Sequence, residues 1–321
     1  DLIAHRPLVL LDRKNRPDLA GKCGTLIPAS AKIYRLPSFL DYVSMGCEIS
    51  LSVAVDFTAS NGTPGKDPHS LHRPYDPARA AAGQSAWNEY QQALIAVGEI
   101  LAPYDSDKQI TAFGFGGIPP GTSAQVSFCF PLNGDGAKPE VPGVQGLLDA
   151  YAQAIQAVKL YGPTNMAPVI AQINSITRES LGRRGLFYNI LLIITDGTVT
   201  DLHPTIDAVV DSSTLPVSIV IVGVQNEQHA EDFDGMHKLD GDDAVLTDAR
   251  GVKAARDIVQ FVPFNPSLRT TPEELAKHVL GEVPHQLVQH FSGKGLKPAS
   301  WGQPGAEFYE LLNTLPPAPK K

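Results

Sequence analysis

The chain has 321 residues, enough for one large α/β domain with additional segments or for two small domains. Hydrophobic residues make up 43% and charged residues 19%, proportions typical of a packed soluble protein. The net charge of −8 argues against a nucleic-acid partner, and against attachment to anionic membranes by charge alone.

The three cysteines, Cys23, Cys47 and Cys129, are odd in number and lack the spacing of a metal site, which favours a reduced intracellular compartment. No stretch approaches the roughly 18 apolar residues of a membrane-spanning helix, and we expect no secretory leader. The chain begins with Asp1 rather than Met, so we expect a fragment of a longer protein.

Residues 1–45 contain too few apolar residues to bury a core of their own. From Glu48 onward, strand-like and helix-like patterns alternate, apart from a long Gly-, Pro- and His-rich segment at 61–85. We expect strands at 48–56, 109–115, 124–130, 188–195, 216–223 and 258–262. We expect helices at 86–101 with Ser85 as its cap, at 143–158, from the turn at 161–165 through 176, at 204–212 and at 272–283.

This alternation predicts an α/β fold with a doubly wound, mostly parallel central sheet and helices on both faces. The continuous apolar run at 188–195 is typical of a strand that is covered on both sides. The segment 124–130 is shorter and more polar, and we expect it to be a short antiparallel edge strand.

Three oxygen-bearing side chains follow the first of these strands on alternate residues: Asp56, Thr58 and Ser60. One interpretation is a helix cap, since Asp, Thr and Ser all cap helices well. The other is a cradle for a hard cation, which prefers oxygen ligands. Asp196 also follows a strand, and Thr164 lies in a loop that can reach the same edge of the sheet. Because ligands in such folds bind at the carboxyl ends of the strands, these five residues predict a metal site.

The same residues resemble a known family. Asp56-Phe-Thr-Ala-Ser60, Tyr161-Gly-Pro-Thr-Asn165 and Thr195-Asp-Gly197 resemble the metal-ion-dependent adhesion site of von Willebrand factor A domains. The wider sequence is similar to the A domain of copines, in blocks that keep their order over roughly residues 38 to 298. These blocks are Val55–Gly62, Tyr104–Lys108, Ala112–Gly116, Leu160–Asn165, Leu239–Asp243, Asp257–Phe264, Gly281–Pro284 and Gly293–Lys297.

The resemblance implies three parts: the end of a preceding lipid-binding β-sandwich domain with a linker (1–45), the A domain (46–292) and a Gly/Pro-rich tail (293–321). It implies that Thr58, Ser60 and Thr164 bind the cation directly, while Asp56 and Asp196 act largely through water. Mg²⁺ suits this set best, with Mn²⁺ or Ca²⁺ as alternatives. Copines in general imply a cytoplasmic protein that calcium recruits to phospholipid membranes through upstream domains, and an A domain that binds protein partners through an acidic side chain.

Other interpretations remain to be weighed against this one. The sequence has no Gly-x-Ser-x-Gly, P-loop or His-Glu-x-x-His motif, so we do not expect an enzyme. Asp240, Asp242 and Asp243 form either a solvated acidic turn or a second calcium site. Plant ubiquitin ligases with copine-like A domains are a further alternative, but their zinc-binding RING would have to lie outside this chain, which has no cysteine after Cys129.

Overall fold

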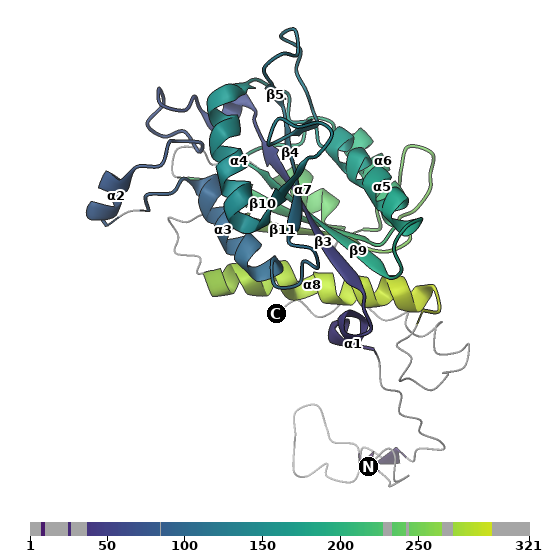
Figure 1. Ribbon diagram of the computed structural model, residues 1–321. Helices are drawn as coiled ribbons and strands as arrows, with labels where there is room; N and C mark the ends of the chain where they lie inside the picture. The colour runs from purple at the N-terminus through teal and green to yellow at the C-terminus, as the bar shows by residue number, and fades with distance from the viewer. Residues whose placement is uncertain are drawn as a thin grey trace.

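The computed structural model describes residues 8–9, 25–26, 37–83, 85–226, 233–241, 244–264 and 272–296. Within these residues, a seven-stranded sheet has the order β11-β10-β9-β3-β4-β6, and β7 also pairs with β4 (Figure 1). Its strands are β3 (Glu48–Asp56), β4 (Gln109–Phe115), β6 (Phe130–Pro131), β7 (Glu140–Pro142), β9 (Phe187–Thr195), β10 (Val217–Val224) and β11 (Val259–Phe264). The five longer strands pair in parallel, whereas β6 and β7 run antiparallel to β4. The predicted mostly parallel α/β fold is therefore confirmed.

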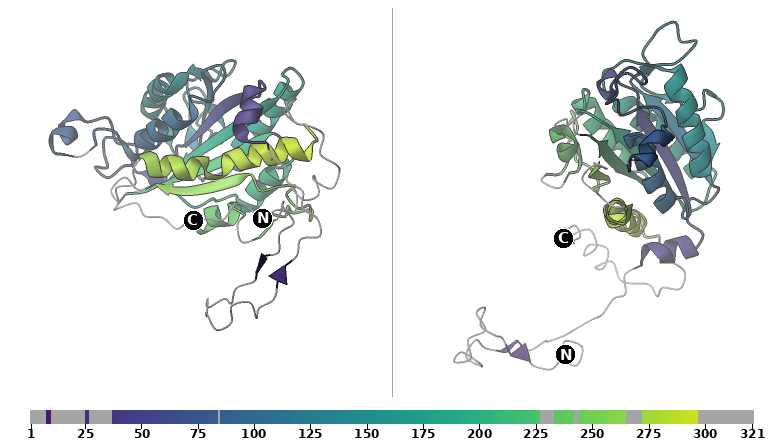
Figure 2. Two further views of the ribbon diagram at one scale, coloured as in Figure 1. Left: turned by 90° about the horizontal axis from the view of Figure 1, so that it is seen from below. Right: turned by 90° about the vertical axis from the view of Figure 1, so that its left-hand side faces the viewer.

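Helices cover both faces of the sheet and form a separate hydrophobic core on each. Side chains from α1 (Phe39–Ser44), α3 (Glu89–Leu101), α4 (Gly143–Ala157) and α8 (Pro272–Gly293) belong to one core. Side chains from α5 (Ala167–Leu181), α6 (Leu202–Ser212) and α7 (Asp234–Leu239) belong to the other. Strand β3 contributes Val53 and Val55 to the first core and Ala54 to the second, because successive side chains of a strand point to opposite faces. Figure 2 shows α8 running alongside β11.

The remaining elements are short. A single-turn 3₁₀ helix, η2 (Ala59–Asn61), follows β3, and α2 (Pro77–Ala81) lies in the long connection to α3. Two antiparallel pairs join β5 (Gly117–Ile118) to β8 (Lys159–Leu160) and β1 (Leu8–Val9) to β2 (Thr25–Leu26). None of the helices in the described ranges is both long and apolar enough to cross a membrane.

The start of α3 differs from the prediction. The helix begins at Glu89, and its cap is Asn88, whose side chain accepts a hydrogen bond from Gln91 N while Gln91 bonds back to Asn88 N. Such a reciprocal capping box satisfies two backbone N–H groups at once. The hydroxyl of Ser85 instead accepts from Trp87 N, which forms a turn outside the helix.

The edge strand and the last helix also differ. The antiparallel edge strand exists, but β6 spans only Phe130–Pro131. Ser123 and Ala124 have positive φ angles of 52° and 64°, which exclude an extended strand at the start of the predicted segment. Helix α8 continues past Pro284 to Gly293. Near its end, the hydroxyl of Tyr42 on α1 bonds to Ser292 Oγ (3.1 Å) and Leu296 O (2.8 Å), so residues 39–44 pack against this helix.

Candidate metal centre

The candidate site lies where the carboxyl ends of β3 and β9 meet. The two strands are parallel neighbours in which Val55 is opposite Ile194, so Asp56 and Thr195 end side by side. Strand β4, which follows β3 in the chain, pairs with the other edge of β3. This reversal of direction is a topological switch point, the place at which open α/β sheets bind ligands.

Asp56 is completely buried and accepts two hydrogen bonds, from Thr58 N (2.7 Å) to Oδ1 and from Thr195 Oγ1 (2.6 Å) to Oδ2. Burial raises the pKa of Asp56, although the hydrogen bonds from Thr195 and Thr58 lower it in part. A side-chain hydrogen bond between Asp56 and Asp196 also lowers this pKa. The two carboxyl groups therefore lie next to each other. Both carboxyl groups lie in almost completely buried residues.

Two hydroxyl groups connect the segment after β3 to Asp196. Thr58 Oγ1 lies 2.9 Å from Ser60 Oγ, and Ser60 Oγ donates to Asp196 Oδ1 at 3.2 Å. The amide of Asn61 donates to Thr58 Oγ1 (3.3 Å) and to Thr58 O (3.2 Å), which holds η2 against the end of the strand. Thr58 is 2% exposed, whereas Ser60 is exposed to solvent. The group of oxygen atoms is thus reachable from the side of Ser60.

The loop that carries Thr164 is hydrogen-bonded to the segment after β3, at Phe57 and Ala59, and to Thr200 in the segment after β9. Tyr161 forms a parallel bridge with Thr58 through Ala59 N to Tyr161 O (2.9 Å) and Tyr161 N to Phe57 O (3.1 Å). Thr164 N donates to Thr200 Oγ1 (3.2 Å), and Thr200 N donates to Thr164 O (2.9 Å). The structure therefore joins Asp56, Thr58, Ser60 and Asp196 through hydrogen bonds, and places Thr164 between the segments that contain them.

These residues fit a hard divalent cation. Two buried carboxyl groups side by side oppose each other's ionisation, and a cation between them would offset both that repulsion and the loss of hydration. The other oxygen atoms are neutral hydroxyls. In the described part of the chain, no three His, Cys, Asp or Glu side chains gather as metal ligands. The donor set is therefore rich in hydroxyls and suits Mg²⁺, Mn²⁺ or Ca²⁺ better than Zn²⁺.

Sequence reasoning did not assign a role to the residues that support the site. His72 is fully buried, with Nε2 2.9 Å from Asp56 O and Nδ1 2.7 Å from the hydroxyl of Tyr151. Burial lowers the pKa of His72 to about 3, so the neutral ring donates to Asp56 O and accepts from Tyr151. His72 lies in the long loop after β3, where no motif or periodicity identifies it.

Asp201 is the second supporting residue. Its two carboxylate oxygens accept from Met166 N (2.9 Å) and Ala167 N (3.0 Å) at the start of α5, directly after the Thr164 loop. Asp201 also accepts from Thr205 Oγ1 (2.9 Å) in α6. A helix start that is capped from another loop leaves no local sequence signal, because the capping residue is distant in the chain.

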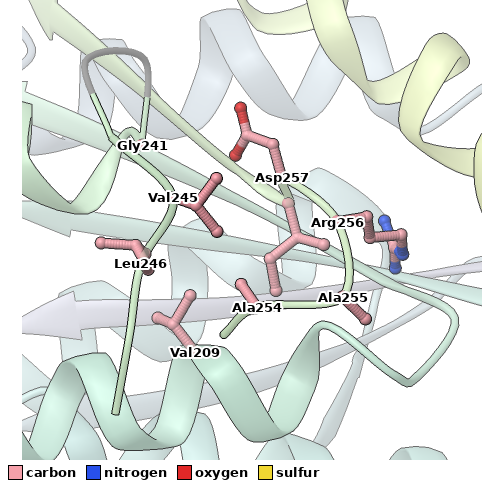
Figure 3. A pocket seen from close by; sticks show the side chains of 9 residues that line it. Val209, Gly241, Val245, Leu246, Ala254, Ala255, Arg256 and Asp257 are labelled. Carbon is pink, nitrogen blue, oxygen red and sulfur yellow. The ribbon is translucent and has the colours of Figure 1, made fainter. Parts of the chain in front are cut away.

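The proposed second site at Asp240, Asp242 and Asp243 has one residue in the described ranges. Asp240 Oδ1 accepts from Phe261 N at 2.9 Å, which ties the end of α7 to β11. Asp242 and Asp243 lie outside the described residues. An apolar hollow of about 170 Å³ is lined by Gly241, and by Val209, Val245, Leu246 and Ala254 among others (Figure 3). The guanidinium of Arg256 donates to Leu215 O and Val217 O. A second calcium site here stays a prediction.

Solved structures to which this chain is similar include a von Willebrand factor type A protein from Catenulispora acidiphila, with 12% identity and a TM-score of 0.36, covering 75% of this chain and 43% of that chain. Another is manganese-loaded Plasmodium vivax TRAP protein, with 10% identity and a TM-score of 0.42, covering 74% of each chain. A third is mussel proximal thread matrix protein 1 with a zinc-occupied MIDAS motif, with 13% identity and a TM-score of 0.35, covering 76% of this chain and 46% of that chain. The chain spans less than half the length of the first and third of these proteins.

A family model described as Copine matches residues 81–299. The match includes Thr164 and Asp196 and begins after the segment that contains Asp56, Thr58 and Ser60. The predicted resemblance to copines is thereby confirmed. Because the match covers more than half of the 321 residues, the protein belongs to the copine family.

Proposed function

We propose that this chain is a protein-interaction domain whose binding depends on a divalent cation. The observation that supports the proposal is the juxtaposition of two buried carboxyl groups, Asp56 and Asp196, with the hydroxyls of Thr58 and Ser60 between them. A buried acidic pair is costly unless a cation or a shared proton compensates it. A binding role agrees with a site whose oxygen atoms are of the kind that hold a hard cation.

In this proposal Thr58, Ser60 and Thr164 supply hydroxyl ligands, and Asp56 and Asp196 act largely through bound water. Mg²⁺ is the first candidate, with Mn²⁺ and Ca²⁺ as alternatives. A cation that binds few charged ligands directly keeps much of its positive charge. It therefore attracts a carboxylate, and an acidic side chain of a partner protein would complete its coordination.

The setting of this interaction is also part of the proposal. We propose that the partners are intracellular proteins, and that the full-length protein is cytoplasmic and recruited by calcium to phospholipid membranes through domains outside this chain. Under this hypothesis the present chain contributes partner choice rather than lipid affinity. Calcium-dependent sedimentation of residues 37–296 with vesicles containing phosphatidylserine would contradict this division of roles.

Isothermal titration of Mg²⁺, Mn²⁺ and Ca²⁺ into the wild type and into Asp56→Ala tests the cation site. We expect saturable heat only with the wild type. Asp105→Asn is a matched control, because Asp105 is also almost fully buried and lies beside Ile49 at the opposite end of β3. Equal heats for the wild type and Asp56→Ala would disprove the site. A pull-down with and without chelator, comparing the wild type with Thr164→Ala, then tests whether partner capture needs the cation.

A further inference from the structure

Strand β8 ends beside the candidate cation site. The next residue, Tyr161, forms a parallel bridge with Thr58. Residues that lie opposite each other in a parallel ladder project to the same face, and successive residues of a strand project to opposite faces. The side chains of Tyr161 and Thr58 therefore share one face. In agreement with this, Phe57 and Leu160, one residue earlier in each segment, both pack in the same hydrophobic core.

Two side chains on this face are open to solvent. Tyr161 is 54% exposed, although its backbone is paired with the buried Thr58. Lys159, two residues before Tyr161 and hence on the same face, is also exposed. Its Nζ lies 5.8 Å from the centroid of the Tyr161 ring, a cation–π contact that holds the ammonium group beside the ring. The candidate cation site is therefore bordered by an exposed aromatic ring and an exposed positive charge.

The charge of Lys159 is available to an anion. A lysine ammonium group has three N–H donors and no acceptor. Within the described residues, no ion pair joins Lys159 to a carboxylate. The residue opposite it in β5 is Ile118, and β5 contains no acidic residue. Lys159 thus presents to solvent a positive charge that no described carboxylate neutralises.

We infer that the partner segment bound at the cation site contains two acidic residues separated by one residue. One carboxylate completes the coordination of the cation, the other pairs with Lys159, and the segment between them crosses the ring of Tyr161. Two residues of a parallel strand extend about 6.6 Å, which is the separation of Lys159 from Tyr161 along the chain; two residues of an extended partner segment cover a similar length, with both side chains on one side. Aromatic residues such as Tyr161 are enriched among those that contribute most to protein binding. The inference rests on the proposed function, because the first carboxylate needs a bound cation.

Three rhodamine-labelled peptides test the need for two acids. One is Gly-Asp-Gly-Asp-Gly with blocked ends, and the other two have asparagine in place of the first or the second aspartate. Fluorescence anisotropy is followed as the full chain is added in excess Mg²⁺. Because either aspartate of the diacidic peptide can reach the cation alone, its association constant is compared with the sum of the two mono-acidic constants. We expect it to exceed that sum by about two- to fivefold, the effect of an exposed ion pair.

Variants then identify the residues responsible. In Lys159→Gln the diacidic constant should equal the sum of the other two. Lys253→Gln is the matched control, because Lys253 is an exposed lysine that precedes the amino end of β11, whereas the site lies at the carboxyl ends of the strands. Tyr161→Ala should weaken all three peptides several-fold, and Tyr161→Phe, which keeps the ring, should bind them as the wild type does. An excess that persists in Lys159→Gln, or unchanged binding in Tyr161→Ala, would overturn the inference.

The inference and the proposed function fail in different ways. Calorimetry with Mg²⁺ alone tests the cation site without any peptide, and a chain that binds no Mg²⁺ would disprove both. If the chain binds Mg²⁺ but the diacidic peptide shows no excess over the sum, or no saturable change at all, the cation site stands and the inference is wrong. Equal binding of the diacidic peptide in Mg²⁺ and in EDTA would also overturn the inference, since the cation would then take no part.

Discussion

The methyl group of Thr58 lies directly over Gly116: a Cβ added to Gly116 would be 2.4 Å from Thr58 Cγ2. Gly116 also has a φ of +78°, a conformation that glycine adopts readily. Because Gly116, directly after β4, has no side chain, there is room for the methyl group of a threonine at position 58 of the candidate cation loop. The hydroxyl of Thr58 consequently keeps its place beside Ser60, although threonine is stiffer and larger than serine.

We predict that Gly116→Ala lowers cation affinity by about tenfold or more, because the new methyl group displaces Thr58. The double variant Thr58→Ser/Gly116→Ala should recover most of that affinity, since serine lacks the clashing methyl. Titration calorimetry with Mg²⁺ measures both. Gly134→Ala is the control for the backbone cost alone, because Gly134 has a φ of +77° and open space around it. If the double variant binds no better than Gly116→Ala, the steric explanation is wrong.

Removal of the cation is predicted to destabilise the wild type and to leave Asp196→Asn almost unaffected. A ligand that binds only the folded state adds about 2.7 kcal/mol when its free concentration is 100 times its dissociation constant. Thermal unfolding with Mg²⁺ and with EDTA should therefore give separated midpoints for the wild type and nearly coincident ones for the variant. Separation of the same size in both proteins would mean that the stabilising ion binds elsewhere.

The carboxylate of Asp201 is predicted to matter for both stability and the site. Asp201→Ala removes the carboxylate that accepts two hydrogen bonds from the start of α5 and one from α6, and loss of a helix cap costs about 1–2 kcal/mol. Because the Thr164 loop ends at this helix start, cation affinity should fall as well. Denaturant unfolding and calorimetry measure the two effects. The control is Asp207→Ala, because the carboxylate of Asp207 accepts only one hydrogen bond, from Ala249 N, in an exposed position. An unchanged cation affinity in Asp201→Ala would show that the cap has no influence on Thr164.

The histidine at the end of α8 predicts a loss of stability in acid. Burial, with smaller contributions from Arg256 and Lys294, lowers the pKa of His290 to about 3. Unfolded histidine titrates near pH 6.5, so this contribution is complete above about pH 6.5 and decreases as the pH falls toward 3.

The measurement is the free energy of unfolding against pH for the wild type, His290→Gln and the exposed control His203→Gln. Between pH 7 and pH 5, we expect the free energy of unfolding to fall by about 2 kcal/mol less in His290→Gln than in the wild type. Glu282, whose pKa burial raises to about 7, acts in the opposite direction, but it is common to all three proteins. Parallel pH profiles for His290→Gln and the wild type would refute the assignment.

The sequence was sufficient for the architecture because the strands of a covered parallel sheet are unambiguous. All nine residues of β9 are buried, and the five from Ile190 to Ile194 form an uninterrupted apolar run that is typical of a strand covered on both faces. The ends of two elements were predicted less well. The cap of α3 is Asn88 rather than Ser85, although its Asn88-x-x-Gln91 capping box is a local motif, and β6 spans only Phe130–Pro131. Neither feature has a periodic pattern.

The candidate site shows the same division. Asp56, Thr58, Ser60 and Asp196 follow predictable strands, and their hydrogen bonds agree with the prediction that they converge. Their supporting residues were not predicted. His72 lies in a long loop and bonds to Asp56 O, and Asp201 accepts from Met166 N, 35 residues earlier in the chain. A single sequence contains no spacing rule that predicts such contacts.

The register between β3 and β9 limits how this domain can change during evolution. The pairing of Val55 with Ile194 both assigns alternate side chains to the two cores and sets Asp56 beside Thr195. A shift of one residue would move each side chain into the opposite core and separate the acidic pair in the same event, so correct packing of the sheet and this part of the site depend on the same register. Variation in cation preference among related domains should therefore accumulate in the connecting segments, at 57–61 and 161–164, where a change alters ligand geometry without disturbing the sheet.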